Sequence, residues 1–365
     1  MMRILLVTND FPPTTGGIQS YVRDFVHTLP AGDIVVYAST QDQHEAALYD
    51  ATVSYPIIRD SARVLLPTPR VRRKMQQIIR TYSVDTVWFG AAAPLGLLAA
   101  AAKEAGATRV VATTHGHEVG WSMLPVARSL LGTIGKHSDC VTYISDYTLD
   151  RFASAFEQKG SCHFAHLPSG VDHDVFRPRP TQHSESLTVV CISRLVPRKG
   201  QDQLIQVWPE FLRAYPHAQL IIAGSGRDEK RLRRLAGDEP TITFSGRISE
   251  TEKVELMQSA DIFAMPCRTR GGGLDIEGLG IVYLEAQACQ VPVIAGNSGG
   301  APETMTADSG LVVHDSKELL RALCYLAEDA ERRRAMGEAG RRNIEENWTW
   351  DTMGRRLRTV LGYAE

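Results

Sequence analysis

Residues 187–214 read LTVVCISRLVPRKGQDQLIQVWPEFLRA, and residues 3–29 read RILLVTNDFPPTTGGIQSYVRDFVHTL. In both stretches a short apolar run precedes a loop rich in proline or glycine, and a segment with helical spacing of apolar residues follows. Such an apolar run, without polar alternation, is typical of a strand buried on both faces of a parallel sheet. The repeated strand–loop–helix unit therefore predicts two doubly wound, Rossmann-like α/β domains.

Further short apolar runs alternate with helical patterns in both halves of the chain. The first half has predicted strands at 4–8, 34–38, 84–89, 110–113 and 141–145, and the second at 188–193, 219–223, 242–245, 262–265 and 293–295. Ligands of doubly wound sheets bind beyond the carboxyl ends of the strands, so we expect the functional loops there.

A stretch without apolar periodicity separates the two halves. Residues 169–186 are rich in Pro, His, Asp, Ser and Arg, which is typical of a linker. We predict an N-terminal domain over residues 1–168 and a second domain over residues 187–345, followed by a C-terminal segment, residues 346–365.

The bulk composition indicates a soluble protein. The 365 residues have a formal net charge of -2, which provides no general attraction to nucleic acid. The six cysteines show no C-x-x-C spacing, so we expect reduced thiols rather than disulfides or a zinc site. The chain enters a strand near its first residue, which leaves no room for a signal peptide, and the apolar stretch 91–102 is too short to span a bilayer. These features predict a cytoplasmic protein.

The strongest functional signal is residues 268–303, RTRGGGLDIEGLGIVYLEAQACQVPVIAGNSGGAPE. A helix is expected to begin near Gly280, after the glycine-rich part. The backbone N–H groups of Gly280, Ile281 and Val282 would then form an anion site that suits a diphosphate.

Two glutamates flank this predicted helix start. Glu277 lies in the loop, where it can accept hydrogen bonds from sugar hydroxyls, and Glu285 lies one turn into the helix, within reach of ribose hydroxyls. The alternative is that these acidic residues only stabilise a helix N-terminus through its dipole.

A basic loop, SRLVPRKG at residues 193–200, follows a predicted strand directly. Arg194 and Lys199 are two cations that can neutralise a pyrophosphate, including the charge that develops on a leaving group. The alternative is an ordinary solvated basic turn.

The N-terminal glycine pair, Gly16 and Gly17, opens the first predicted helix. Paired glycines permit close backbone approach to a phosphate, although a structural turn explains them equally well. The pattern is not G-x-G-x-x-G, so nicotinamide binding is disfavoured.

The segment THGHE, residues 114–118, also follows a predicted strand. Its histidines, His115 and His117, have the H-x-H spacing of metal ligands, but no further ligand cluster completes a site. We interpret one of them as a residue that hydrogen-bonds a sugar or stabilises developing charge, and the other as a structural histidine. The acidic segment 172–174 is interpreted as a turn, so no metal is expected.

The stretch from Pro69 to Arg80 is basic and amphipathic, PRVRRKMQQIIR. Such a pattern suits an anionic membrane surface, and it equally suits a surface helix packed through its apolar stripe.

Taken together, these motifs resemble the retaining GT-B glycosyltransferases, the large family that contains glycogen-synthase-like enzymes and mannosyltransferases. The resemblance covers nearly the whole chain. The stretches WFGAAAPLGLLA, THGHEVGWSMLP, YISDYTL and HLPSGVD look similar to actinobacterial GDP-mannose-dependent phosphatidylinositol monomannoside mannosyltransferases. The resemblance implies two Rossmann-like domains facing a central cleft, the first binding the acceptor and the second the nucleotide sugar.

The resemblance also implies roles for individual residues. Arg194 and Lys199 would bind the donor diphosphate, Glu285 the ribose and Glu277 the mannose. The remaining implied contacts are the guanine at Gly246, Arg247 and Ile248, the donor phosphates or the acceptor at Gly16 and Gly17, and the transferring sugar at His115. Residues 346–365 would form a helix that returns to the first domain.

The implied reaction transfers mannose from GDP-mannose to the inositol 6-position of phosphatidylinositol monomannoside, with retention, at the inner face of the plasma membrane and without a metal or other cofactor. The alternatives are another donor or acceptor, a GT-B sugar-nucleotide epimerase, and a nucleotide-sugar-binding regulatory module without turnover.

Overall fold

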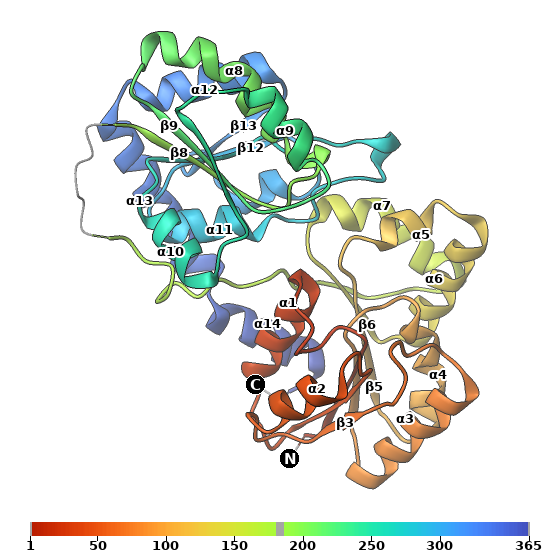
Figure 1. The fold of residues 1–365 in the computed structure, drawn as a ribbon. Coiled ribbons are helices and arrows are strands. Elements are labelled where there is room, and N and C mark those ends of the chain that lie inside the picture. Colours follow the sequence, from red (N-terminus) through yellow and green to blue (C-terminus); the bar gives the residue numbers. More distant parts are fainter. Residues whose placement is uncertain (1, 180–185, 364–365) are drawn as a thin grey trace. The chain divides into compact units, whose positions relative to one another are not determined.

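The computed structural model describes residues 2–179 and 186–363, so part of the predicted linker, residues 180–185, lies outside the described residues. Contacts within the chain divide it into two compact units (Figure 1). Unit 1 comprises Met1–Ser169 and Trp350–Glu365, and unit 2 comprises Gly170–Thr349. Each unit is built around one parallel sheet, and each is described by itself.

Unit 1 has a seven-stranded sheet among its described residues, in the order β3-β2-β1-β4-β5-β6-β7 with every neighbouring pair parallel. The order reverses at β1, which lies between β2 and β4. The strands are β1 Ile4–Thr8, β2 Ile34–Ala38, β3 Ile57–Arg59, β4 Thr86–Phe89, β5 Arg109–Thr113, β6 Cys140–Tyr143 and β7 Phe164–His166.

Helices connect these strands. They are α1 Gly17–His27, α2 Gln43–Asp50, α3 Pro69–Tyr82, α4 Ala99–Glu104, α5 Glu118–Ser122, α6 Pro125–His137, α7 Asp146–Phe156 and the last helix of the chain, α14 Trp350–Leu361, with 3₁₀ turns at η1 Leu95–Leu98 and η2 Glu157–Lys159. Helix α14 packs on α1, where the rings of Phe25 and Trp350 meet edge to face at 5.2 Å. The Arg109 Nε–H also donates to the carbonyl of Val360 at 2.7 Å. The C-terminal helix is therefore part of unit 1.

Unit 2 repeats the plan with a six-stranded parallel sheet, in the order β10-β9-β8-β11-β12-β13 within the described residues. Here the order reverses between β8 and β11. The strands are β8 Thr188–Ile192, β9 Gln219–Ala223, β10 Ile242–Gly246, β11 Ile262–Met265, β12 Val293–Gly296 and β13 Gly310–Val313. The helices are α8 Gln201–Ala214, α9 Glu229–Ala236, α10 Glu250–Gln258, α11 Ile281–Ala288, α12 Ser316–Ala327 and α13 Ala330–Asn347, with 3₁₀ turns at η3 Pro197–Lys199, η4 Gly271–Gly273 and η5 Ala301–Thr304.

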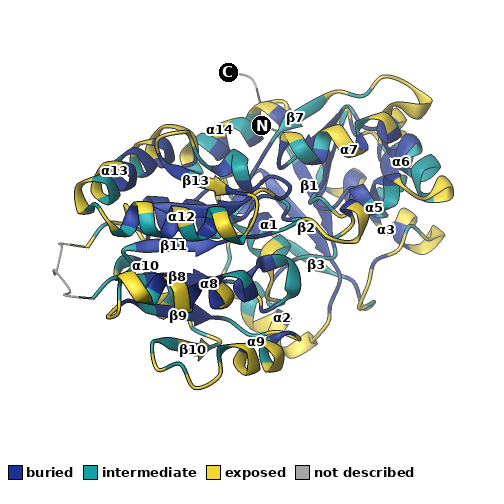
Figure 2. Ribbon diagram, turned by 90° about the horizontal axis from the view of Figure 1, so that it is seen from above, coloured by how far each residue is buried: buried dark blue, intermediate teal, exposed yellow. Residues whose placement is uncertain are grey.

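The strand interiors form the core of each unit. All five residues of β1 and of β2 are buried, as are all four of β11, whereas exposed residues lie on the outer faces of the helices (Figure 2). Central strands of a parallel sheet are covered on both faces, which explains their continuous apolar runs. Both parallel sheets confirm the predicted α/β class with two Rossmann-like domains.

Three strands were not predicted, and all lie at sheet edges: β3, β7 and β13. Strands β3 and β7 contain only three residues each, all half-buried. An edge strand pairs on one side only and lacks a long apolar run, so its sequence gives a weak signal. No described helix has the length and apolar character needed to cross a bilayer.

Candidate active site

The predicted functional loops follow the central strands of each sheet. In unit 2, residues 193–200 follow β8, and residues 266–280 follow β11, its neighbour in the sheet. Because the strands are parallel, both loops leave the same edge of the sheet at the point where the strand order reverses. This is where doubly wound sheets bind ligands.

Helix α11 begins next to this point, as the sequence predicts. Its N-cap is Gly280, in the left-handed conformation at φ 93°. A Cβ at this position would lie 2.6 Å from the Tyr283 ring, so both conformation and space require glycine. The N–H groups of Ile281 and Val282 belong to the first turn, where no intrahelical carbonyl is available to them. The helix start therefore offers donors to an anion.

Lys199 and Glu277, two residues that the sequence predicts to bind the donor, form an ion pair with each other. The Lys199 Nζ lies 2.7 Å from the Glu277 Oε2, and both residues are buried, at 8% and 7% exposure. The turn that places Lys199 continues into Gly200 at φ 79°, where a Cβ would lie 2.0 Å from the carbonyl oxygen of Pro266. A glycine is therefore needed to bring the loop after β8 against the end of β11.

The two arginines of this basic loop have different surroundings. Arg198 is partly buried, and its guanidinium donates to Asp275 at 3.1 Å. Arg194 is exposed, and its side chain has no hydrogen-bond or ion-pair partner among residues 2–179 and 186–363. The Arg194 guanidinium is thus available to a ligand, whereas Arg198 is held in the protein.

Glu285 is buried one turn into α11 and contacts a lysine that the sequence analysis did not single out. The Lys253 Nζ donates to the Glu285 Oε1 at 2.8 Å. Burial raises the pKa of the Glu285 carboxyl, and the ammonium of Lys253 opposes that shift. The position of the Glu285 side chain is therefore fixed by a contact from α10 as well as by its own helix, α11.

The predicted guanine loop, Gly246, Arg247 and Ile248, joins strand β10 to α10. Gly246 has a left-handed φ of 68° that directs the chain out of the strand. Ser249 then caps α10 in a capping box with Glu252. The predicted guanine loop continues directly into α10, and Lys253 of the same helix contacts Glu285. One helix therefore connects this loop with Glu285.

In unit 1, Gly16 and Gly17 lie at the start of α1. Gly16 is the N-cap, and a Cβ there would lie 2.3 Å from the Gln19 Oε1. The Gln19 Nε2 donates to the Asp10 Oδ1 at 2.7 Å. Burial raises the pKa of Asp10, and the charge of His117 opposes this shift. The glycines therefore lie beside a carboxylate and an amide at the carboxyl end of β1.

His115 follows β5 and is fixed in one tautomer. Its Nε2–H donates to the carbonyl of Gly90 at 2.6 Å, because a carbonyl can only accept. Its ring meets the ring of Tyr21 edge to face at 5.0 Å. Burial lowers the pKa of His115 to about 4, so the ring is neutral at pH 7 and its Nδ1 is an acceptor.

His117 is the more exposed histidine, at 41% for its side chain. Its Nε2 lies 3.2 Å from the Oε1 of the fully buried Glu118. The Glu118 Oε2 accepts hydrogen bonds from the backbone N–H groups of His115 and Gly116, each at 3.1 Å. A buried carboxylate thus fixes the loop that presents both histidines.

The described residues contain no group of three or more His, Cys, Asp and Glu side chains that could hold a metal ion. The acidic segment after unit 1 is a turn, as interpreted from the sequence, because the Asp172 Oδ1 accepts from the backbone N–H groups of Asp174 and Val175.

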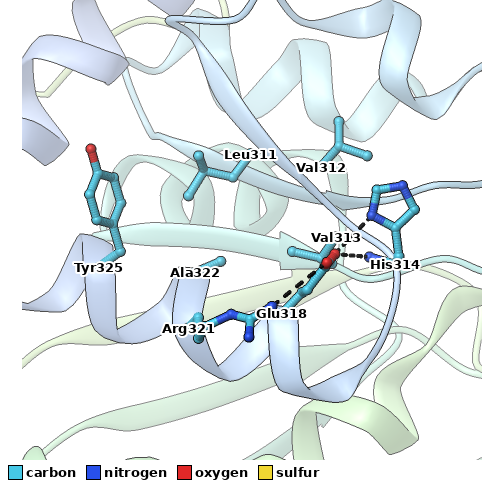
Figure 3. Close-up of a pocket in the computed structure, with 8 residues that line it drawn as sticks. All are labelled: Leu311, Val312, Val313, His314, Glu318, Arg321, Ala322 and Tyr325. Atoms are coloured by element: carbon cyan, nitrogen blue, oxygen red, sulfur yellow. Dashed lines mark hydrogen bonds and ion pairs between the residues drawn. The ribbon is translucent and has the colours of Figure 1, made fainter.

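A pocket of about 500 Å³ lies elsewhere in unit 2, between edge strand β13 and α12 (Figure 3). His314 and Arg321 both turn toward Glu318 there, at 2.8 and 3.7 Å. The residues that line it are Leu311, Val312, Val313, His314, Glu318, Arg321, Ala322 and Tyr325. None of them is a predicted site residue, so this pocket is separate from the candidate site.

Sequence reasoning missed the side chains that hold the predicted residues in place, namely Asp10, Gln19, Glu118 and Lys253. Glu118 belongs to the THGHE segment, whose acidic residue could have indicated a partner for a histidine or for backbone N–H groups. Lys253 gave no such signal, because its partner is distant in the sequence.

Two family models match the chain. The model described as Glycosyl transferases group 1 matches residues 172–343, and the model described as Glycosyltransferase Family 4 matches residues 15–175. Several solved glycosyltransferase structures have the same fold. A structure of Anabaena HepE in complex with UDP and glucose aligns at a TM-score of 0.78 with 18% identity, covering 100% of both chains. A sucrose-phosphate synthase from Thermosynechococcus elongatus aligns at 0.77, covering 99% of this chain and 98% of that one. The protein is a glycosyltransferase of the GT-B fold.

Proteins with high sequence identity over the full chain show which family of glycosyltransferases this chain belongs to. A Corynebacterium glutamicum protein named GDP-mannose-dependent monoacylated alpha-(1-6)-phosphatidylinositol monomannoside mannosyltransferase is 54% identical, over 98% of this chain and 97% of its own length. A Mycobacterium tuberculosis protein named GDP-mannose-dependent alpha-(1-6)-phosphatidylinositol monomannoside mannosyltransferase is 49% identical, over 99% and 98%. Within the glycosyltransferases, this chain belongs to the family of these mannosyltransferases.

Proposed function

We propose that this enzyme transfers mannose from GDP-mannose to the 6-position of the inositol ring of a phosphatidylinositol monomannoside, giving the dimannoside. The observation that carries the proposal is the full-length similarity, at 49–54% identity, to enzymes named for this donor and acceptor. The reaction would belong to the biosynthesis of phosphatidylinositol mannosides and lipoglycans.

The donor diphosphate is proposed to bind in unit 2 at the start of α11. Arg194 would supply a guanidinium that has no partner among the described residues, Lys199 a buried ammonium, and Ile281 and Val282 backbone N–H groups. Glu277 would accept hydrogen bonds from mannose hydroxyls. These cations and amides supply the positive charge that a diphosphate needs, so the proposal requires no metal ion or other cofactor.

The remaining donor contacts are proposed for ribose and base. Glu285 would bind ribose hydroxyls, and the backbone of Gly246, Arg247 and Ile248 would bind guanine. The connection of this loop to Glu285 through α10 supports the assignment, because one helix would then align both parts of the nucleoside.

Unit 1 is proposed to bind the acceptor. The neutral ring of His115 would accept a hydrogen bond from the transferring mannose at Nδ1, and Gly16 and Gly17 would permit close approach of the donor phosphates or the acceptor. His117 is the less suitable sugar ligand, since its Nε2 lies against Glu118.

We propose a front-face displacement that retains the anomeric configuration. The bond from the anomeric carbon to the diphosphate oxygen breaks while the inositol oxygen bonds to the same face of that carbon. The inositol hydroxyl proton passes to the departing phosphate oxygen. Arg194, Lys199 and the α11 start would stabilise the charge of that leaving group.

A peripheral contact with an anionic membrane is proposed for α3. Its apolar stripe, including Val71 and Met75, is buried inside unit 1, so the contact must be mainly electrostatic. Arg70 and Arg72 pair with Asp60 and Glu104 respectively. The exposed cations Arg73, Lys74 and Arg80 would therefore face the lipid, together with the exposed side chains of Val64 and Leu66 in the preceding loop. We place this contact at the cytoplasmic face of the plasma membrane.

The test is a parallel reaction of the purified enzyme with GDP-mannose or UDP-glucose and with phosphatidylinositol monomannoside in vesicles. Only GDP-mannose is expected to give a product, and this product carries one additional hexose. Mass and linkage analysis should locate that hexose at the inositol 6-position. Transfer from UDP-glucose at an equal rate, or conversion of the donor without any acceptor, would refute the proposal.

A further inference from the structure

Glu285 is a buried carboxylate with only one of its oxygens engaged. The residue is 7% exposed, and its Oε1 accepts from Lys253 at 2.8 Å. Its Oε2 is also buried and has no hydrogen-bond partner among the residues that the structure describes. An unpaired buried carboxylate oxygen is unfavourable, and it therefore suggests that a ligand group fills this position.

Lys253 is held on several sides. Its side chain is 16% exposed, and its Nζ lies 2.8 Å from the Glu250 Oε2 as well as from Glu285. The same Nζ lies over the ring of Phe176, 5.1 Å from the centroid. Burial lowers the pKa of Lys253, but the two carboxylates more than offset this and the net shift is upward. The ammonium is therefore charged and fixed in direction.

We infer that Lys253 is a positioning residue for the donor ribose: it holds the Glu285 carboxylate through Oε1, so that Oε2 points to the ribose hydroxyls. This inference rests on the proposed function, in which Glu285 binds the ribose. Lys253 need not touch the donor itself. Without its cation, the buried carboxylate would bind a proton more readily, and a protonated Glu285 would be a poorer acceptor.

The chain offers a matched set of variants on α10. Lys253→Met removes the ammonium and keeps the length of the side chain. Lys253→Arg keeps a cation that can reach Glu285. Glu250→Gln removes the other carboxylate that contacts Lys253, and the side chain of Glu250 is 86% exposed, so it serves as the control.

The experiment measures, by calorimetry on the full-length protein, the Kd of GDP and of 2′,3′-dideoxy-GDP. Hydrogen bonds to a charged group predict that wild type prefers GDP by about tenfold or more. Lys253→Met should reduce this preference to about twofold, mainly by weakening the binding of GDP. Lys253→Arg and Glu250→Gln should keep most of it. In the transfer assay, Lys253→Met should raise the donor KM by about tenfold and leave kcat within about twofold.

Equal weakening of both nucleotides by Lys253→Met, with the preference for GDP retained, would overturn the inference, because it would indicate a base contact or a general structural role. If Lys253→Met does not fold, the same comparison is made with Lys253→Gln. If wild type binds UDP better than GDP, the proposed donor is wrong. The test then uses UDP and 2′,3′-dideoxy-UDP, with the same outcomes deciding the role of Lys253.

Discussion

The Nζ of Lys199 lies 2.7 Å from the Oε2 of Glu277, and both side chains are buried at the carboxyl edge of the unit 2 sheet. The sequence suggests separate roles for them, a diphosphate ligand and a sugar ligand. As an ion pair they also compensate each other's buried charge while no donor is bound. A diphosphate would share Lys199 with Glu277, so donor binding and the stability of this site are linked.

The first prediction concerns this linkage. Glu277→Gln leaves the Lys199 ammonium buried without its carboxylate, which should lower the free energy of unfolding by about 1–3 kcal/mol. GDP should then raise the melting temperature more in the variant than in wild type, because its phosphates replace the missing charge. Differential scanning fluorimetry with and without GDP measures both effects. An equal GDP-induced shift in the two proteins would contradict the linkage.

The second prediction separates the two proposed phosphate cations. Arg194→Ala should reduce transfer about 10- to 100-fold with an unchanged melting temperature, since the Arg194 side chain has no partner among the described residues. Lys199→Ala should reduce transfer about 100- to 1,000-fold and also lower stability, because the buried Glu277 carboxylate loses its cation at 2.7 Å and keeps only the Arg198 Nε at 3.9 Å. Steady-state kinetics with GDP-mannose and thermal melting provide the measurements. Lys230→Ala, an exposed change on α9, is the control, and near-normal transfer in both test variants would refute the diphosphate site.

The third prediction is a pH dependence of stability that comes from His115. Its pKa is about 4 in the folded protein and near 6.5 in an unfolded chain. Between these values the unfolded state binds more protons, so the free energy of unfolding falls as the pH is lowered from about 6.5 to 4. From pH 7 to pH 5 this contribution should be about 1–2 kcal/mol, allowing for partial solvent access to the ring.

Urea denaturation at pH 7 and pH 5 measures this contribution. His115→Gln, which keeps an N–H donor for Gly90, should show a smaller loss of stability than wild type over this range. His44→Gln, at an exposed position on α2, is the matched control and should behave as wild type. An identical loss in wild type and His115→Gln would mean that His115 titrates normally.

The fourth prediction concerns the membrane contact of α3. Reversing the charges of Arg73 and Lys74 to Glu should weaken binding to vesicles that contain anionic phospholipid by about tenfold or more, since each basic residue near such a surface is worth about 1 kcal/mol. Transfer to a water-soluble acceptor should be unaffected. Vesicle sedimentation measures the binding. Lys230→Glu with Arg234→Glu makes the same charge change on α9 of unit 2, and an equal loss of binding in that control would exclude a specific role for α3.

Much of the fold could be predicted because local burial patterns are visible in the sequence. Strands β1, β2, β9 and β11 have the predicted bounds, since each is a continuous apolar run in the middle of a sheet. The start of α11 was also predictable, because Gly280 marks a backbone turn before a regular helix. The edge strands β3, β7 and β13 could not be predicted, since segments of three or four residues have no distinctive period, whereas the five-residue edge strand β10 was predicted.

The sequence by itself determined the class of the protein, the identity of the charged loops and the strand that precedes each of them, because burial and turn chemistry act between residues close together in the chain. Only the tertiary structure decided which of these groups meet. The neighbouring positions of β8 and β11 bring Lys199 to Glu277, and the packing of α10 on α11 brings Lys253 to Glu285. Such pairings depend on the order of strands in the sheet and on helix packing, which no local pattern specifies.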